Sequence, residues 1–254
     1  MLLVMAEHQS NTTWTNWSGK LSASPREIVQ VGTIEAIRAE LSAASKGGWS
    51  VRTAGTAHSH YPLLPTNGVL LDTRPLSGLV EVDQETPSAT FRAGTKIHAC
   101  GRPLLDHGLG LINQGDIDQQ SIGGAIATGT HGTGTELGSF SSVVEKLSIM
   151  LVDGSVVTCD QHTESELFEA ARLSLGAVGI VLEATLKVRK AYRLKEEQWQ
   201  EPLDSVMERI ESLTSASRHF EYFWWPGQDG APVSYTHLRA HETKANLVCR
   251  LLLE

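Results

Sequence analysis

Two glycine-rich segments contain the residue types that could hold a phosphorylated ligand. Residues 121–134, with the sequence SIGGAIATGTHGTG, are rich in Gly, Ala and Thr and leave little side chain to pack. Glycine loses more backbone entropy on folding than any other residue, so glycine clusters are typical of places where the backbone approaches something closely. Backbone N–H groups can hold a phosphate there, and the alternative is a flexible loop. A second turn at residues 54–59, AGTAHS, favours the phosphate interpretation.

Local patterns predict the elements that position the glycine turn at 54–59. Thr33 can cap a helix with apolar residues at helical spacing, and the glycines at 47–48 end it. Residues 49–53, WSVRT, predict a strand that runs directly into the glycine turn. In a dinucleotide-binding Rossmann fold the glycine loop opens a helix directly after a strand, so this order of elements disfavours that fold.

Patterns after residues 121–134 predict a sheet with few helices. An Asp-Gly pair at 153–154 lies between two apolar runs and predicts a hairpin. Thr163 and Glu166 form a capping box for a helix that continues through Leu173. Residues 182–189 alternate between apolar and polar and predict a strand with one solvated face. Together these elements predict an α+β domain that ends near Arg189.

The last part of the chain combines a helical pattern with aromatic residues. Residues 202–213 predict a helix, and residues 219–225, HFEYFWW, predict a strand. Aromatic side chains at this density could line a substrate pocket or fill a core. Core packing is favoured, because most large aromatic residues are buried for packing.

Composition and charge limit the possible partners. The 254 residues can bury a sizeable core, and the formal net charge of −8 argues against nucleic acid as the main partner. No apolar run approaches the roughly 20 residues of a transmembrane helix. The first residues lack the basic region of a secretory signal. The three cysteines show no metal-ligand spacing, so we expect no metal and a cytoplasmic location.

Three motifs together resemble one flavoprotein family. They are the Gly-x-x-His-Ser turn at 55–59, the Gly-Thr-His-Gly-Thr-Gly stretch at 129–134, and Leu-Gly-Ala-Val-Gly-Ile-Val at 175–181. In this order they resemble the family of vanillyl-alcohol oxidase and p-cresol methylhydroxylase (PCMH). Within it, the resemblance is to the sugar-1,4-lactone and alditol oxidase branch, which includes gulonolactone, arabinonolactone and alditol oxidases.

The resemblance implies a division of the chain into four parts. A lead-in at 1–15 precedes a PCMH-type FAD-binding domain of two α/β subdomains at 16–190, and the beginning of a truncated substrate (cap) domain follows at 191–232. Residues 233–254, VSYTHLRAHETKANLVCRLLLE, resemble the translation of a sequencing-library adapter. We therefore expect this last part to be a non-native tail.

The resemblance also implies that FAD binds between the two glycine segments. An acidic protein can bind the FAD pyrophosphate only if local donors outweigh the overall repulsion, and the turn at 53–59 can aim consecutive N–H groups at it. The stretch at 128–131 can close from the other side, and the backbone of Val181 is expected to contact adenine. The implied cofactor-binding residues are Thr53, Ala54, Gly55, Thr56, Ala57, His58, Ser59, Asp116, Ser121, Gly124, Thr128, Gly129, Thr130, His131 and Val181.

Four side chains have more than one interpretation. In the family, a histidine at the position of His58 is bonded covalently to the isoalloxazine methyl group, and the alternative is an ordinary histidine packed near FAD. His60 is a possible competitor for that bond. Asp116 could orient a substrate hydroxyl or flavin N5 as a catalytic residue, or cap the following helix, and capping is favoured. His131 is interpreted first as a structural donor to the cofactor, and second as a proton-transfer group.

The implied activity is FAD-dependent oxidation of a CH–OH group in a sugar lactone or polyol. A hydride would pass to flavin N5 while a base removes the hydroxyl proton, and O₂ or another acceptor would reoxidise the flavin. The family's catalytic base lies in the C-terminal substrate domain, so we expect this chain to hold FAD but to turn over poorly or not at all. The alternatives are a related flavoenzyme for a lipid-linked sugar or aromatic alcohol, and a flavin-free binding module.

Overall fold

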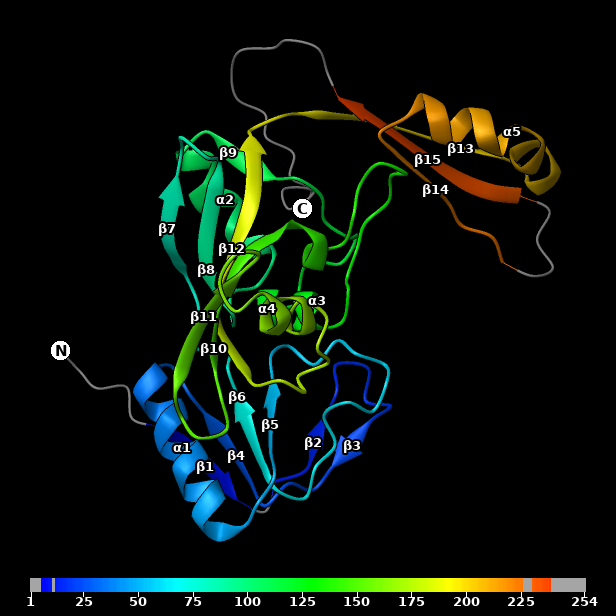
Figure 1. The fold of residues 1–254 in the computed structure, drawn as a ribbon. Coiled ribbons are helices and arrows are strands. Elements are labelled where there is room, and N and C mark those ends of the chain that lie inside the picture. Colours follow the sequence, from blue (N-terminus) through cyan, green and yellow to red (C-terminus); the bar gives the residue numbers. More distant parts are fainter. Residues whose placement is uncertain (1–5, 11, 226–229, 239–254) are drawn as a thin grey trace.

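The computed structural model describes residues 6–10, 12–225 and 230–238. Over this part of the chain the strands form a four-stranded, a six-stranded and a three-stranded sheet, with a two-stranded ribbon beside the first (Figure 1). The predicted α+β class is confirmed. None of the helices within the described residues is long and apolar enough to cross a bilayer.

The first sheet is mostly parallel and is covered by one helix. Its strand order is β1-β4-β6-β5; β4 and β5 pair with β6 in parallel, and β1 is an antiparallel edge. Helix α1 packs on the sheet through Ile37, Leu41 and Ala44. The elements are β1 (Glu7–Ser10), β4 (Glu27–Gln30), α1 (Ile34–Gly47), β5 (Val51–Ala54) and β6 (Val69–Asp72), with the ribbon β2 (Trp14–Thr15) and β3 (Ser22–Ala23).

Both predicted ends of α1 are confirmed. Thr33 is its N-cap, and the Thr33 hydroxyl accepts a hydrogen bond from the backbone N–H of Ala36 at 3.1 Å. At the other end Gly48 adopts a left-handed conformation with φ of 68°. Such a conformation is easy for glycine and lets its N–H bond to the last carbonyls of the helix.

Thr33→Ala is expected to lower the free energy of unfolding by about 1 kcal/mol, because it leaves a helix N–H without its acceptor. Urea denaturation followed by circular dichroism measures the change. Ser42→Ala, on the exposed face of the same helix, is the matched control. It should cause no loss, since alanine is the better helix former. Equal unfolding midpoints for the two variants would contradict the role of the cap.

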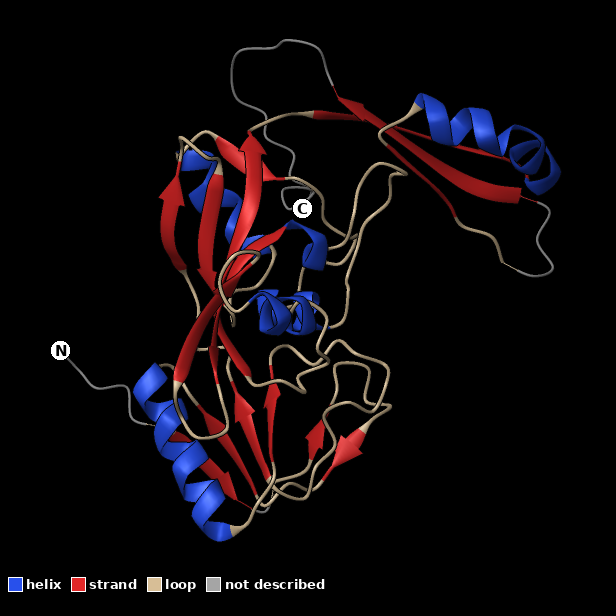
Figure 2. Ribbon diagram, in the orientation of Figure 1, coloured by secondary structure: helices blue, strands red, loops and turns tan. Residues whose placement is uncertain are grey.

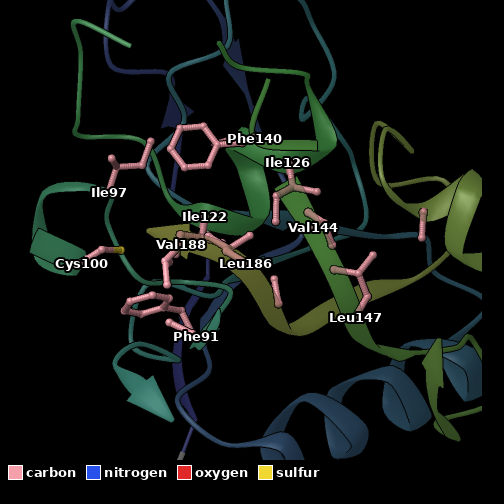
Figure 3. Packing of buried hydrophobic residues seen from close by; sticks show 14 of the residues in the cluster. Phe91, Ile97, Cys100, Ile122, Ile126, Phe140, Val144, Leu147, Leu186 and Val188 are labelled. Carbon is pink, nitrogen blue, oxygen red and sulfur yellow. The ribbon is translucent and has the colours of Figure 1, made fainter. Parts of the chain in front are cut away.

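The second sheet is antiparallel and contains the larger core. Its order is β11-β10-β12-β8-β7, and β9 also pairs with β12. Helices α2 and α3 pack on it, so that Phe91, Ile122, Ile126, Leu186 and Val188 meet in one cluster (Figure 3). The elements are β7 (Leu79–Asp83), β8 (Ser88–Arg92), α2 (His98–Asp106), β9 (Leu109–Leu111), α3 (Ile122–Ala127), a 3-10 turn (Phe140–Val143), β10 (Val144–Met150), β11 (Val156–Asp160), α4 (Ser165–Ala171) and β12 (Ile180–Lys190).

One local prediction in this sheet is confirmed and one is wrong. The Asp-Gly pair at 153–154 connects β10 to β11 in an antiparallel hairpin. The predicted capping box is not formed, because α4 begins one residue later, with Glu164 at its N-cap. The carboxylate of Asp160 accepts the backbone N–H groups of His162 and Thr163 at 2.7 and 2.8 Å. This turn holds Thr163 outside the helix.

The third sheet begins after β12 and has the order β13-β15-β14. Its elements are β13 (Leu194–Pro202), α5 (Leu203–Ala216), β14 (His219–Tyr222) and β15 (Gly230–Leu238). They confirm the predicted helix, and they confirm the strand predicted at 219–225 for its first four residues only. Residues 233–238 of the predicted tail lie in β15, and residues 239–254 lie outside the described residues. The division of the chain at 190 and the non-native origin of the tail stay predictions.

The aromatic residues of this last part divide into two groups. Phe220 and Tyr222 pack against Val206, as expected for a core. Phe223, Trp224 and Trp225 follow β14 and are 46%, 47% and 50% exposed. The core interpretation therefore holds for the first two residues only.

Candidate cofactor-binding site

A pocket lies at the junction between the first two sheets. It is bordered by the carboxyl ends of β5 and β6, by α3 and by the segment that enters β12. Figure 2 shows that loops occupy much of this junction. The carboxyl ends of parallel strands are a common place for ligands. The empty space between the lining residues is about 1070 Å³, and this volume includes open solvent.

Both predicted glycine segments line this pocket, although they are more than sixty residues apart in the chain. Eleven of the residues predicted to bind a cofactor are at its surface. They are Thr53, Gly55, Thr56, Ala57, His58, Ser59, Ser121, Gly124, Thr128, Thr130 and Val181.

The two segments touch at Gly55 and Ser121. A Cβ atom added to Gly55 would lie 2.0 Å from the Ser121 hydroxyl oxygen and 2.9 Å from the Ser121 Cβ. No real Cβ atom approaches another atom so closely, so glycine is required here for the close approach of the segments. Ser121 is itself 3% exposed and has little room to move.

Backbone hydrogen bonds fix the position of α3 beside the pocket. The N–H groups of Ile122 and Gly123 donate to the carbonyls of Thr95 and Ala93, both at 2.8 Å. At the other end of the helix, the N–H of Leu175 donates to the carbonyl of Ala127 at 3.1 Å. These bonds connect α3 to the segment after β8 and to the segment before β12, so this wall of the pocket is fixed to the second sheet.

Among the described residues that line the pocket, His58 is the one with a titratable side chain. Burial lowers the pKa of its imidazole below the ordinary value, and the charges of Lys96 and His60 lower it further. The residue before it, Ala57, has φ of +58°, a conformation that only glycine adopts without strain. The lowered pKa favours the neutral form of the imidazole, and this side chain follows a strained backbone unit.

Four predicted residues do not line the pocket. Ala54 is buried at the end of β5, where its carbonyl accepts from the N–H and the hydroxyl of Thr73. Gly129 lies in the turn after α3, and His131 is exposed, with its Nδ1 donating to the Gly132 carbonyl at 2.8 Å. Asp116 is also exposed.

The capping interpretation of Asp116 is wrong, because α3 begins at Ile122 with Ser121 at its N-cap. The catalytic role of Asp116 stays a prediction.

Several lining residues were missed from the sequence. Thr73 reaches the pocket only because β6 pairs with β5, and no local signal marks it. The pocket is also lined by Ser174, Leu175 and Gly176. They lie in or next to the motif at 175–181, of which only Val181 was predicted to contact the cofactor.

Gln120 also lines the pocket, directly before Ser121. Its side-chain oxygen Oε1 is buried and has no hydrogen-bond partner among the described residues. Adjacency to Ser121 could have indicated this residue.

Comparison with family models matches two parts of the chain. Residues 25–160 match the FAD binding domain, and residues 184–251 match D-arabinono-1,4-lactone oxidase.

Among curated proteins, L-gulono-1,4-lactone dehydrogenase of Mycobacterium tuberculosis is 34% identical over 231 residues, which cover 91% of this chain and 53% of that protein. L-Gulonolactone oxidase of Mus musculus is 29% identical over 235 residues, which cover 91% of this chain and 52% of that protein. The chain thus spans about half the length of the curated relatives it matches.

A solved structure has the same fold. Cholesterol oxidase from Brevibacterium sterolicum superposes with a TM-score of 0.81 at 20% sequence identity, over 92% of this chain and 48% of that chain. At this identity the likeness extends to the fold alone.

Proposed function

Because the chain belongs to the FAD-binding domain family, whose model matches residues 25–160, we propose that the pocket between the two glycine segments holds FAD. We propose further that the chain is the cofactor-holding part of an oxidoreductase that acts on a CH–OH group of a sugar lactone. The observation that carries the proposal is that both glycine segments line a single pocket.

The chemistry of the lining fits a dinucleotide. The chain has a net charge of −8, yet no Asp or Glu is among the described lining residues. Ser and Thr hydroxyls and glycine-rich backbone surround the space, so hydrogen-bond donors can face a pyrophosphate without a nearby carboxylate. The buried, unpartnered Oε1 of Gln120 is an acceptor for an N–H or O–H group of the cofactor.

The residues have separate tasks in this proposal. Thr53, Thr56 and Ser59 border the pocket from β5 and the turn after it, and Thr128 and Thr130 border it from the turn after α3. They would bind and orient the cofactor, and their hydroxyls would replace the hydrogen bonds that the free cofactor makes with water. When bound, FAD supplies the two-electron chemistry of alcohol oxidation, with O₂ or another acceptor taking the electrons.

We also propose that His58 is joined covalently to the isoalloxazine methyl group. The imidazole nitrogen forms a bond to the methyl carbon, and one N–H and one C–H bond are broken. The two protons and two electrons pass to dioxygen, which becomes hydrogen peroxide. The lowered pKa of His58 supports this, because the attacking nitrogen must be unprotonated.

Gln120→Met is expected to have opposite effects on stability and on FAD affinity. It should raise the free energy of unfolding of the FAD-free protein by about 1 kcal/mol, because a buried acceptor without a partner is removed. It should weaken FAD binding about tenfold, equivalent to about 1.4 kcal/mol, because that acceptor is lost to the cofactor. Denaturant unfolding and FAD fluorescence titration measure the two changes.

The matched control for Gln120→Met is the same substitution at the exposed neighbour Gln119, which does not line the pocket. FAD affinity should not change in Gln119→Met. Equal affinity in Gln120→Met and the wild type would show that Oε1 does not meet the cofactor.

The proposed substrate class is tested by anaerobic reduction of the flavin. The FAD-loaded chain, alone and joined to the C-terminal half of the mycobacterial relative, is mixed with L-gulono-1,4-lactone, an alditol or an aromatic alcohol. We expect bleaching of the visible flavin absorbance by the lactone in the joined protein. Bleaching by the alditol or the aromatic alcohol but not by the lactone would overturn the assignment of a lactone substrate. A protein that stays colourless after FAD is added would overturn the assignment of FAD as the cofactor.

A further inference from the structure

A short N-terminal segment lies against the turn that contains His58. The indole of Trp17 stacks on the imidazole of His58 with ring centroids 5.1 Å apart and an interplanar angle of 19°. This segment does not line the pocket, and the family resemblance assigned it no role. Its contact with His58 is therefore a feature of the fold that the proposed cofactor contacts do not explain.

Hydrogen bonds from this segment hold the backbone on both sides of His58. The Trp17 N–H donates to the carbonyl of Ala57 at 3.2 Å. The side-chain amide of Asn16 donates to the carbonyl of Ser59 at 3.0 Å. The residues before and after His58 are thus each tied to the same pair of neighbouring residues.

Asn16 is built into the fold as an anchor for these bonds. It is 3% exposed, and its side-chain oxygen accepts from the N–H of Leu21 at 3.0 Å and from the hydroxyl of Ser18 at 3.3 Å. Its backbone N–H also donates to the Leu21 carbonyl at 3.0 Å. Both the oxygen and the nitrogen of the Asn16 amide are therefore hydrogen-bonded, and the bonds to its oxygen come from within its own loop.

The turn needs such support because Ala57 has φ of +58°. A residue with a Cβ in this region is strained, and strain of this kind persists only where the surroundings over-determine it. The bond from Trp17 to the Ala57 carbonyl is one such restraint.

The contact also distinguishes between the two histidines of the turn. Trp17 stacks face to face with His58, but it meets His60 at an edge, with centroids 5.6 Å apart and an angle of 75°. His58 lines the pocket and His60 does not. The same indole thus stacks on the imidazole that lines the pocket and meets the other imidazole only at an edge.

We propose that Asn16 and Trp17 are positioning residues that hold the His58 imidazole in the orientation required for its bond to the flavin. The inference rests on the proposed covalent attachment. The stacked indole covers one face of the imidazole and excludes water from it. The lowered pKa of His58 agrees with this, because burial is its largest cause.

The test measures how fast FAD becomes covalent in the full chain. Apoprotein is mixed with FAD, and the flavin that stays with the acid-denatured polypeptide is recorded over time. Trp17→Ala should slow attachment about tenfold, because a displaced nucleophile reacts slowly, and should leave non-covalent affinity unchanged. Trp17→Phe keeps a ring and should restore the rate. Trp49→Ala removes another exposed tryptophan outside the pocket and should have no effect.

A second measurement separates failure of this inference from failure of the covalent proposal. An NMR titration measures the pKa of the His58 imidazole in the wild type and in Trp17→Ala. The signal of His58 is the one that is missing in His58→Ala. Loss of the stack should raise the His58 pKa toward its ordinary value. If wild-type flavin is released on denaturation, the covalent proposal fails, and the inference that rests on it fails too. If wild-type flavin stays attached, the two comparisons with Trp17→Ala test the inference alone. An unchanged pKa, or an unchanged attachment rate in a folded Trp17→Ala protein, overturns it.

Discussion

His58→Ala is expected to release all of the flavin when the polypeptide is denatured, whereas the wild type retains it. The reason is that the imidazole nitrogen is the proposed nucleophile and alanine offers no replacement. The measurement is flavin fluorescence of the acid-precipitated pellet compared with the supernatant. The native variant should still be yellow, because the remaining lining residues of the pocket are unchanged.

His60→Ala is the matched control for this experiment. His60 lies two residues farther along the same turn and does not line the pocket. Its removal should leave the flavin attached. If attachment is lost in His60→Ala and kept in His58→Ala, the bond to the flavin is made by His60 and not by His58.

Gly55→Ala is expected to reduce FAD affinity about 100-fold, or about 2.7 kcal/mol, because the two glycine segments must separate to admit a methyl group. The new Cβ would lie 2.0 Å from the Ser121 hydroxyl and 2.9 Å from the Ser121 Cβ. Both atoms belong to a residue that is 3% exposed. FAD titration by fluorescence quenching measures the loss.

A second substitution shows whether this contact is the cause. Apart from the neighbours of Gly55 in the chain, only atoms of Ser121 lie within 4 Å of the added Cβ among the described residues. Gly55→Ala combined with Ser121→Gly should therefore regain most of the affinity. Gly110→Ala is the matched control, because its Cβ would meet Tyr192 at an ordinary 3.8 Å. If the double variant binds FAD no better than Gly55→Ala alone, the steric explanation is wrong.

Features with local causes were the ones predictable from the sequence. Thr33 and Gly48 mark the ends of α1 because a hydroxyl acceptor and a left-handed glycine act within one helical turn. The same kind of reasoning failed at Thr163, where a competing turn around Asp160 uses the neighbouring N–H groups first. Local hydrogen bonds thus explain both why the ends of α1 were predicted correctly and why the start of α4 was not.

The site was predictable where a motif carried it and not elsewhere. The segments at 53–59 and 121–130 were found because glycine-rich sequence and family resemblance mark them. Thr73 depends on parallel pairing of β6 with β5, and Trp17 depends on a contact across about forty residues of chain. No pattern in the neighbouring sequence of either residue records those contacts.

Strand β12 fixes the distance between the pocket and the start of the third sheet. Its first residues, Ile180 and Val181, border the pocket, and its end at Lys190 leads to the third sheet. Its eleven residues span roughly 35 Å at the usual rise of a strand. Because β12 is paired on both sides, one inserted residue would turn inward-facing side chains outward over the rest of its length. Insertions and deletions between the pocket and the third sheet should therefore be tolerated after Lys190 and not within β12.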